Sequence, residues 1–263
     1  MVSNPQKQYK DNHNQWIFTK EEMNCTPSII DGMSYQEEWD TRYKGIAFID
    51  KVLRPLKRPQ IVISTASVLF HRFYMRQSLK VIHHYDIAGT VAFLSTKIEE
   101  NKMGLLAVAH SCAQVGSRST LKVDDSLVEK WKGVILKYEA IVLELVCFDM
   151  NIIHPYNTIE HFLSSFAFPV KVGKMAWAFV NDNLRSPLCL LYPAKVVSFS
   201  ALYLACLIYS KESNSVDQEK KLSQSVLKDN MIDIDVLQNC LLDILDFYNL
   251  QKSMELKLLC DEL

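Results

Sequence analysis

The chain has 263 residues, of which 49% are hydrophobic and 22% are charged, the balance of a globular protein rather than a disordered one. Its 29 lysines and arginines against 30 aspartates and glutamates give a formal net charge of −1, so it lacks the overall positive field that draws proteins to nucleic-acid phosphates. Only 7 glycines and 8 prolines occur, which is too few for the many tight turns of a β-rich fold. Composition therefore predicts a helix-rich protein.

Apolar residues recur at spacings of three and four along most of the chain, the pattern of helices that bury one face. No alternating strand pattern competes with them. The predicted helices, in chain order, are 36–53, 60–76, 84–100, 105–115, 124–148, 157–165, 172–185, 193–210 and 235–250. The clearest is 124–148, where the apolar face runs from Leu127 through Trp131 to Phe148, and Asp124 offers an N-cap.

A weak internal repeat suggests how these helices are organised. Residues 87–97 and 197–207 share an order of small and apolar residues, so that Phe93-Leu94-Ser95-Thr96 matches Tyr203-Leu204-Ala205-Cys206. Each segment is expected to be a central helix whose small residues let its neighbours pack closely. The pattern favours two all-helical repeats joined near residues 151–156, although two unrelated buried helices can also look this similar.

The cysteines and histidines do not form a recognisable metal site. The seven cysteines show no C-x-x-C spacing, and neither the pair His110 and Cys112 nor the His83-His84 doublet has the further ligands that a metal needs. We expect no metal and no cofactor, and reduced, buried thiols in an intracellular protein. The cysteines are Cys25, Cys112, Cys147, Cys189, Cys206, Cys240 and Cys260.

Signatures of catalysis and of membrane insertion are also missing. No phosphate-binding loop, dinucleotide fingerprint, nucleophile elbow or H-E-x-x-H motif occurs, which favours a binding module over an enzyme. The first eleven residues are too polar for a signal peptide. The uncharged run 196–210 is shorter than the roughly 20 residues of a membrane span, so we expect a buried helix there and no membrane partner.

Two charged residues lie at the edge of predicted apolar faces. Lys97 borders the face of helix 84–100, and Glu139 borders the face of helix 124–148. On neighbouring helices they could form a partly desolvated pair, which is worth holding only where geometry or a partner satisfies it. Periodicity alone favours two solvated helix edges over such a pair, and it predicts that Glu99 and Glu100 form an exposed helix end.

These residues fall in segments that resemble a transcriptional cyclin of the cyclin T and cyclin K type. The resemblance covers nearly all of residues 16–250, and its most specific parts are the HRFYM block and the lysine followed by paired glutamates. The resembling blocks are Trp16-Ile17-Phe18-Thr19, Thr26-Pro27-Ser28, Ser64-Thr65-Ala66, His71-Arg72-Phe73-Tyr74-Met75, Phe93 to Glu100, Ala109-His110-Ser111-Cys112, Phe148-Asp149, His154-Pro155-Tyr156 and Met175 to Asp182.

The resemblance implies an all-α fold of two tandem five-helix cyclin-box repeats with an N-terminal helical extension. The implied divisions are an N-terminal segment 1–35, a first cyclin box 36–151, a second cyclin box 156–250 and a tail 251–263. In cyclins the lysine and glutamate that match Lys97 and Glu139 form the centre of the surface that grips the kinase. Phe93, Glu100 and Phe148 match positions that border that surface.

The resemblance also implies a partner and a role. The expected partner is cyclin-dependent kinase nine, which would make the chain the regulatory, non-catalytic half of positive transcription elongation factor b, a nuclear kinase of the RNA polymerase II C-terminal domain. Residues 109–112 and 16–19 look more like cyclin T, whereas 175–182 look more like cyclin K. The alternative is therefore a cyclin K-like partner of another kinase of that domain.

The sequence differs from the cyclin pattern at two places, and two other classes of protein are alternatives to a cyclin. Thr41-Arg42-Tyr43-Lys44-Gly45 stands where cell-cycle cyclins carry Met-Arg-Ala-Ile-Leu, so we do not expect cyclin A-like substrate docking, and the loop 101–104 is shorter than in the family. A DNA-binding factor of the transcription factor IIB kind also has two cyclin-like repeats, but it needs basic stripes, and no direct DNA binding is expected here. An enzyme that uses His110 and Cys112 is the second rival.

Overall fold

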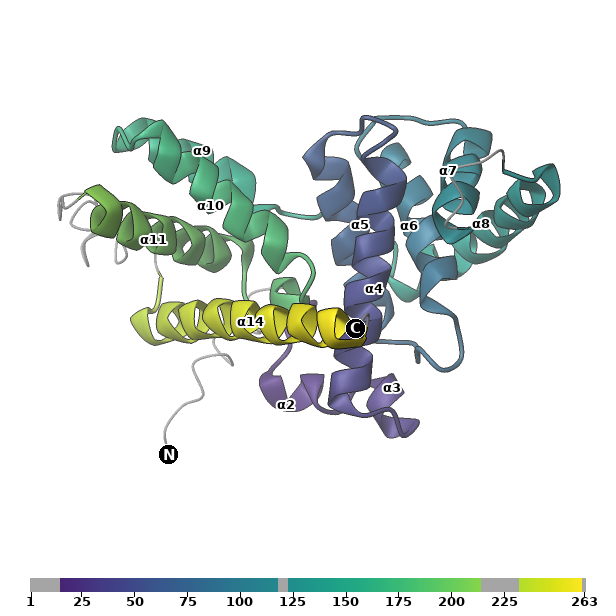
Figure 1. Cartoon of the computed structure of the whole chain (residues 1–263), viewed down its shortest axis with the longest axis horizontal. Helices are drawn as coiled ribbons and strands as arrows, with labels where there is room; N and C mark the ends of the chain where they lie inside the picture. Colours follow the sequence, from purple (N-terminus) through teal and green to yellow (C-terminus); the bar gives the residue numbers. More distant parts are fainter. Residues whose placement is uncertain (1–14, 118–122, 214–231, 262–263) are drawn as a thin grey trace. The chain divides into compact units, whose positions relative to one another are not determined.

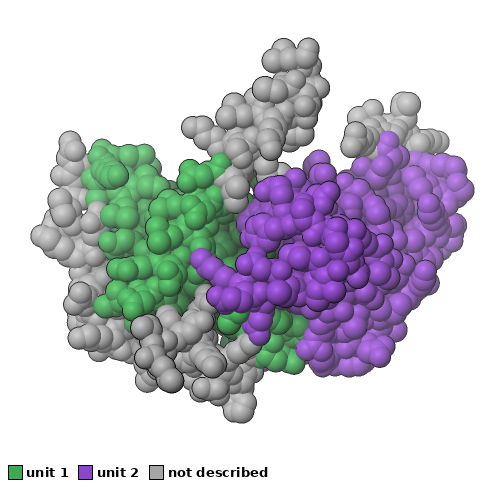
Figure 2. Space-filling view, turned by 90° about the horizontal axis from the view of Figure 1, so that it is seen from below, with its two compact units in different colours: residues 1–19, 153–263 green, residues 20–152 purple. Residues whose placement is uncertain are grey.

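The computed structural model describes residues 15–117, 123–213 and 232–261, with side chains as far as residue 249. Every regular element in these ranges is helical (Figure 1), which confirms the all-α prediction. The chain divides into two compact units (Figure 2). We call Lys20–Ile152 the N-terminal unit, and Ile153–Leu263 together with Met1–Thr19 the C-terminal unit.

The N-terminal unit contains the helices predicted between residues 36 and 148. Their bounds agree with the periodicity to within a few residues, because helices of this length show several turns of apolar spacing. Two one-turn helices precede them, too short to carry such a pattern. The elements are α2 (Lys20–Met23), α3 (Pro27–Ile30), α4 (Tyr35–Leu53), α5 (Gln60–Phe73), α6 (His84–Ile98), α7 (Leu105–Ser117) and α8 (Asp125–Leu145).

Helix α6 is the centre of this unit, as its small residues predicted. It packs against α4, α5, α7 and α8. A Cβ atom on Gly89 would lie 2.9 Å from Cζ3 of Trp131 and 3.2 Å from Sγ of Cys112. Because side chains do not tolerate such short contacts, only glycine allows α8 and α7 to approach α6 this closely.

The C-terminal unit is built around the second predicted central helix. Helix α11 (Ala194–Ser213) contacts α9 (Pro155–Ser165), α10 (Val170–Asn183) and α14 (Ile234–Asp261), and a short 3-10 helix, η1 (Pro187–Leu190), precedes it. Among the described residues α11 is the one helix long and apolar enough to cross a membrane, and 61% of its apolar window is buried in the unit. It is a core helix, as the uncharged run 196–210 predicted.

Two tyrosine hydroxyls attach α14 to the rest of the C-terminal unit. Tyr192 donates to Oδ2 of Asp243 over 2.6 Å, and Tyr248 donates to Oδ2 of Asp182 over 2.9 Å. Burial, together with the adjacent carboxylate, raises the pKa of both phenols. The segment before α2 joins this unit too, since the Phe18 N–H donates to the Leu190 carbonyl over 2.7 Å.

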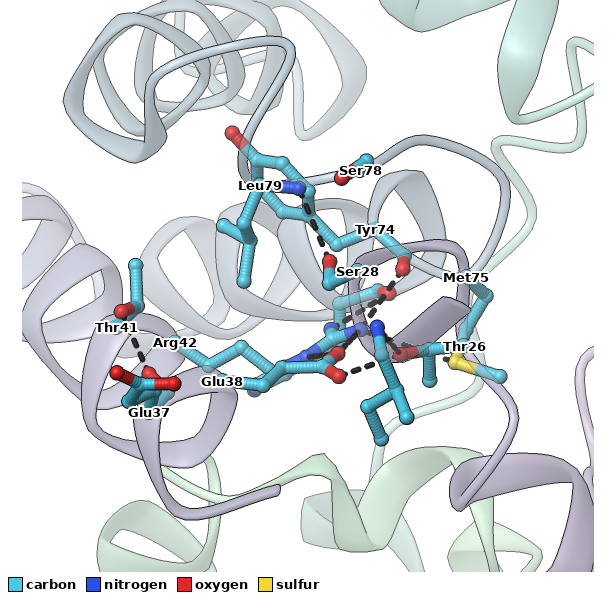
Figure 3. Close-up of polar contacts among 12 residues, drawn as sticks. Thr26, Ser28, Glu37, Glu38, Thr41, Arg42, Tyr74, Met75, Ser78 and Leu79 are labelled. Carbon is cyan, nitrogen blue, oxygen red and sulfur yellow. Dashed lines mark hydrogen bonds and ion pairs between the residues drawn. The ribbon is translucent and has the colours of Figure 1, made fainter. Parts of the chain in front are cut away.

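A buried ion pair organises one end of the N-terminal unit (Figure 3). Nη2 of Arg42 lies 2.7 Å from Oε1 of Glu38, and both side chains are at most 5% exposed. The guanidinium also donates to the carbonyls of His71 and Tyr74, at 3.2 and 2.9 Å. The Thr26 hydroxyl donates to the other carboxylate oxygen of Glu38. The pair thereby links the segment between α2 and α3 to α4 and to the C-terminal end of α5.

Packing explains why this chain has a glycine, Gly45, at the position of the leucine in Met-Arg-Ala-Ile-Leu. Gly45 is buried in α4, and a Cβ atom there would lie 2.2 Å from Cζ of Phe70. The Phe70 ring therefore takes the space that a leucine side chain would need. A leucine at this position would require the Phe70 ring to move.

The C-terminal end of α4 offers a matched test of the buried pair. Asp50 of α4 pairs with the C-cap residue Arg54 at the same spacing, and the Arg54 side chain is 65% exposed. We expect Arg42→Ala to lower the free energy of unfolding by about 3–5 kcal/mol, since it leaves the Glu38 carboxylate buried without its partner. Arg54→Ala should cost less than about 1 kcal/mol. Urea unfolding monitored by circular dichroism measures both, and similar losses for the two variants would contradict the assignment.

Candidate functional site

The structure brings Lys97 and Glu139 together across two helices. Lys97 lies in the last turn of α6, and Glu139 lies in α8, which packs on α6. The Lys97 Nζ atom is 2.6 Å from Oε1 of Glu139, and their side chains are 45% and 20% exposed. The two charges at the edges of predicted apolar faces are thus an ion pair at the surface, not two separately solvated helix edges.

The aromatic ring of Phe93 packs against the Lys97 ammonium group of this pair. It lies one turn before Lys97 in α6, and its ring centroid is 4.3 Å from Nζ of Lys97. The ring is nearly fully buried, so its electron-rich face is fixed against the ammonium group in a cation–π contact. Phe93 therefore orients Lys97 and presents little surface of its own.

Apolar side chains flank the pair on α8. Leu136 precedes Glu139 by three residues and Leu143 follows it by four, so both are its neighbours on the helix surface. Leu136 is 57% exposed, and Leu143 is half-buried. Sequence analysis did not single them out. The sequence signal that could have identified them is that they are apolar residues on the otherwise polar side of the helix, away from the face of Trp131 and Ile135.

The paired glutamates after Lys97 have different roles. Glu99 is not a solvated helix end, since its Oε1 accepts a 2.6 Å hydrogen bond from the Thr65 hydroxyl of α5. Glu100 is exposed and has a φ of 51°, in the left-handed region where a chain commonly leaves a helix. Among the described residues no hydrogen bond links its carboxylate to the Lys97–Glu139 pair.

Phe148 was predicted on the buried face of helix 124–148, and this prediction is wrong. The helix ends at Leu145, and Cys147 and Phe148 both have positive φ, 56° and 53°. Hydrogen bonds fix this turn: the Phe148 N–H donates to the Leu143 carbonyl over 2.9 Å, and Nη1 of Arg72 donates to the Asp149 carbonyl over 2.9 Å. Phe148 is 64% exposed as a result.

We call the pair, its neighbours on α6 and α8, and the two residues Glu100 and Phe148 that follow these helices the α6–α8 surface. It combines an oriented ion pair, exposed leucine and a phenylalanine held outward by a fixed turn, which are the features of a protein-binding surface with a desolvated centre. Its members are Phe93, Lys97, Glu100, Leu136, Glu139, Leu143 and Phe148. All of them belong to the N-terminal unit.

No enzymatic chemistry is visible at the alternative site. His110 is exposed, whereas Cys112, two residues further along α7, is completely buried, and burial raises the pKa of its thiol. A thiol that resists ionisation is a poor nucleophile. Among the residues that the structure describes, no group of three or more histidine, cysteine, aspartate or glutamate side chains is placed to hold a metal ion.

The thiols are also less uniformly buried than the sequence predicted. Cys112, Cys206 and Cys240 are buried, but Cys189 is only partly so, and Cys25 and Cys147 are exposed. Cys147 is exposed for the same reason as Phe148, because the helix ends before it. The side chain of Cys260 lies outside the described part of the chain.

Comparison with known proteins identifies relatives, although no family model matches the chain. It is 40% identical over 198 residues to cyclin pch1 of Schizosaccharomyces pombe, which covers 74% of this chain and 58% of the relative. It is 36% identical over 197 residues to cyclin-T1-2 of Oryza sativa subsp. japonica, covering 72% and 31%. It is 32% identical over 219 residues to cyclin-C of Rattus norvegicus, covering 79% and 76%.

The fold agrees with these relatives. A chain in the crystal structure of the yeast RNA Pol II CTD kinase complex CTDK-1 superposes with a TM-score of 0.74 at 17% identity, covering 88% of this chain and 72% of that one. Two helical units with a central helix in each are the architecture of a cyclin, and the chain belongs to the cyclin family. It spans 58% of the length of the fission-yeast relative and 31% of the rice one.

The Lys97–Glu139 pair should contribute little to stability, because both groups are partly exposed and water screens their attraction. A double-mutant cycle with Lys97→Ala, Glu139→Ala and both together is expected to give a coupling free energy below about 1 kcal/mol. Chemical unfolding of the four proteins measures it. A coupling above about 2 kcal/mol would assign the pair a structural role.

The thiols should differ in reactivity toward iodoacetamide in the folded protein at pH 8. Cys25 and Cys147 are expected to react, whereas Cys112, Cys206 and Cys240 should stay unmodified until the chain is unfolded, since a buried thiol is neither accessible nor ionised. Mass spectrometry of the digested protein locates the labels. Rapid labelling of Cys112 in the native state would restore the enzymatic alternative.

Proposed function

We propose that this chain is the regulatory subunit of a cyclin-dependent kinase that phosphorylates the C-terminal domain of RNA polymerase II in the nucleus. Membership of the cyclin family supports a kinase partner, and the likeness to a chain of the CTDK-1 complex agrees with this class of kinase. The observation on which the proposal rests is the oriented Lys97–Glu139 pair with apolar neighbours on α8. The α6–α8 surface is the proposed kinase-docking site.

The proposed action is allosteric. A protein kinase aligns ATP only when its strand lysine is paired with the glutamate of its regulatory helix, and a cyclin bound against that helix favours the paired state. Shifting a kinase from about 1% to about 99% active needs roughly 5.5 kcal/mol of differential binding. An interface of about 1,600 Å² can supply this.

The arrangement of the α6–α8 surface suits such a task. Lys97 and Glu139 offer charged hydrogen-bonding groups to a partner's polar backbone or side chains, while Leu136, Leu143 and Phe148 provide apolar area that is only partly covered in the free chain. Because Phe93 and the turn at Phe148 hold these groups in place, docking loses little side-chain entropy.

Within this class, the kinase partner that we favour is cyclin-dependent kinase nine. This follows from the resemblance of residues 16–19 and 109–112 to cyclin T, and from the similarity to a plant cyclin T. A cyclin K-like role with another kinase of the same domain is the alternative, supported by residues 175–182. A DNA-binding role is disfavoured by the acidic Glu100 and Glu139 of the α6–α8 surface and by the adjacent Glu99.

The experiment measures phosphorylation of a polymerase C-terminal repeat peptide by cyclin-dependent kinase nine, alone and with this chain. We expect strong activation by the intact chain and at least a tenfold loss with Lys97→Ala plus Glu139→Ala, or with Leu136→Asp, since central contacts dominate an interface. Lys171→Ala plus Glu212→Ala is the matched control, because it removes a Lys–Glu pair that joins α10 and α11 in the C-terminal unit. This control should activate normally.

Three outcomes would redirect the proposal. Activation of a different transcriptional kinase, but not of cyclin-dependent kinase nine, would favour the cyclin K-like alternative. Equal activation by the control and by the Lys97, Glu139 double variant would show that docking uses another surface. Binding to duplex DNA that weakens steeply with salt, with no kinase activated, would favour the transcription factor IIB-like role.

A further inference from the structure

The C-terminal unit has an open groove between α9 and α10 that the proposed kinase docking does not use. Its cavity volume is about 540 Å³, within the usual range of ligand pockets. Most of the lining residues are apolar, and its polar side chains are one lysine and one asparagine. The residues used below are Leu163, Phe168, Val170, Lys174, Trp177 and Asn181.

The groove follows from the spacing of residues on α10. Val170, Lys174, Trp177 and Asn181 recur at intervals of four, three and four, so they lie along one stripe of the helix. Leu163 of α9 and Phe168 of the connection between α9 and α10 form the opposite wall. Val170 is 77% exposed, so the apolar wall of the groove reaches the surface of the unit.

The walls of the groove are held in place before any partner binds. The Trp177 ring packs against Tyr156, with ring centroids 4.6 Å apart. The Tyr156 hydroxyl donates to Oδ1 of Asn181 over 2.8 Å, which leaves the amide nitrogen of Asn181 as a donor. On the side of α9, a Cβ atom at Gly173 would lie 2.8 Å from Cδ1 of Leu163, so the two helices are in close contact there.

The charges of the groove identify what it would accept. Lys174 is exposed and is the one ionisable residue in the lining, which contains no aspartate or glutamate. The adjacent Lys171, in contrast, pairs with Glu212 of α11. Within the described part of the chain Lys174 forms no ion pair. Both polar groups of the lining, the ammonium of Lys174 and the amide nitrogen of Asn181, are therefore hydrogen-bond donors that suit carboxylate or carbonyl oxygens.

We propose that the groove between α9 and α10 is a docking site for a segment of a partner protein that combines large apolar side chains with an acidic residue. The apolar side chains insert between Leu163, Val170 and Trp177. The carboxylate pairs with Lys174, and a backbone carbonyl of the segment accepts from Asn181. This site would recruit a second protein to the chain, independently of the kinase at the α6–α8 surface.

The test uses the full chain and a phage-displayed library of random peptides. Peptides are selected on the intact chain after counter-selection on Lys174→Glu plus Ala178→Arg. Ala178 is an exposed residue of the lining, so the new side chains reverse the charge of the groove and fill its exposed side. The expected enriched sequences contain leucine or phenylalanine beside aspartate or glutamate. A selected peptide is then synthesised with a fluorescent label and titrated by anisotropy against single variants.

We expect Lys174→Glu to weaken binding at least tenfold, and replacement of the peptide carboxylate by lysine to restore binding to this variant. Lys195→Glu is the matched control, because Lys195 is an exposed lysine of the same unit outside the lining, and it should bind as tightly as the intact chain. Circular dichroism of each variant verifies that it is folded.

Four results would overturn the proposal. Enrichment of no sequence, or of sequences without acidic residues, would show that the groove does not select this chemistry. Equal binding to the Lys174 and Lys195 variants would place the peptide elsewhere. A dimer in sedimentation that Lys174→Glu dissociates would assign the groove to a second copy of the chain. Tight binding of a single-stranded oligouridine that Lys174→Glu abolishes would assign it to nucleic acid.

Discussion

The buried pair of Glu38 and Arg42 is the interaction on which the arrangement of the N-terminal unit depends. Two charges withdrawn from water are stable only when each is fully hydrogen-bonded, and here the guanidinium satisfies both the carboxylate and two carbonyls at the C-terminal end of α5, where helical carbonyls lack partners. That end of α5 in turn holds the turn after α8, because Arg72 donates to the Asp149 carbonyl and Arg76 to Sγ of Cys147. The C-terminal end of α5 and the residues just after it thus contact both the buried pair and the turn that exposes Phe148.

The α6–α8 surface separates recognition from stability. The Lys97–Glu139 pair is too exposed to hold the fold together. Phe93 orients Lys97 through a cation–π contact, and the exposed Leu136 adds apolar area one turn away from Glu139 on α8. When a partner excludes water, the two charges attract each other more strongly in the lower dielectric. They also lose their hydration, so a partner must supply hydrogen bonds to both groups. In the free chain Leu136 and Phe148 are exposed to water. This exposure is slightly unfavourable, and it leaves the apolar side chains accessible to a partner.

The C-terminal unit, like the N-terminal unit, is built around a central helix, but the two units expose different side chains at their surfaces. Helix α11 is as central there as α6 is in the N-terminal unit. The outer face of α10, however, presents Lys174 and Trp177 over an open groove, where α5 is buried along nearly its whole length. One helical architecture thus offers two dissimilar surfaces, and the functions proposed for them depend on these surfaces rather than on the shared fold.

The sequence by itself determined the helices, because apolar spacing over three or more turns defines both a helix and its buried face. It also marked Lys97 and Glu139, since a charge beside an apolar face interrupts a regular pattern. Only the tertiary structure shows that Lys97 and Glu139, 42 residues apart in the chain, are joined by a 2.6 Å hydrogen bond. It also shows that Glu99 is bound to Thr65 rather than solvated. Periodicity predicted that α8 extends to Phe148. In the structure the helix ends at Leu145, because Cys147 and Phe148 have left-handed φ angles and Arg72 of α5 holds the turn that follows. Local spacing cannot report such contacts, because they are made by segments distant in sequence.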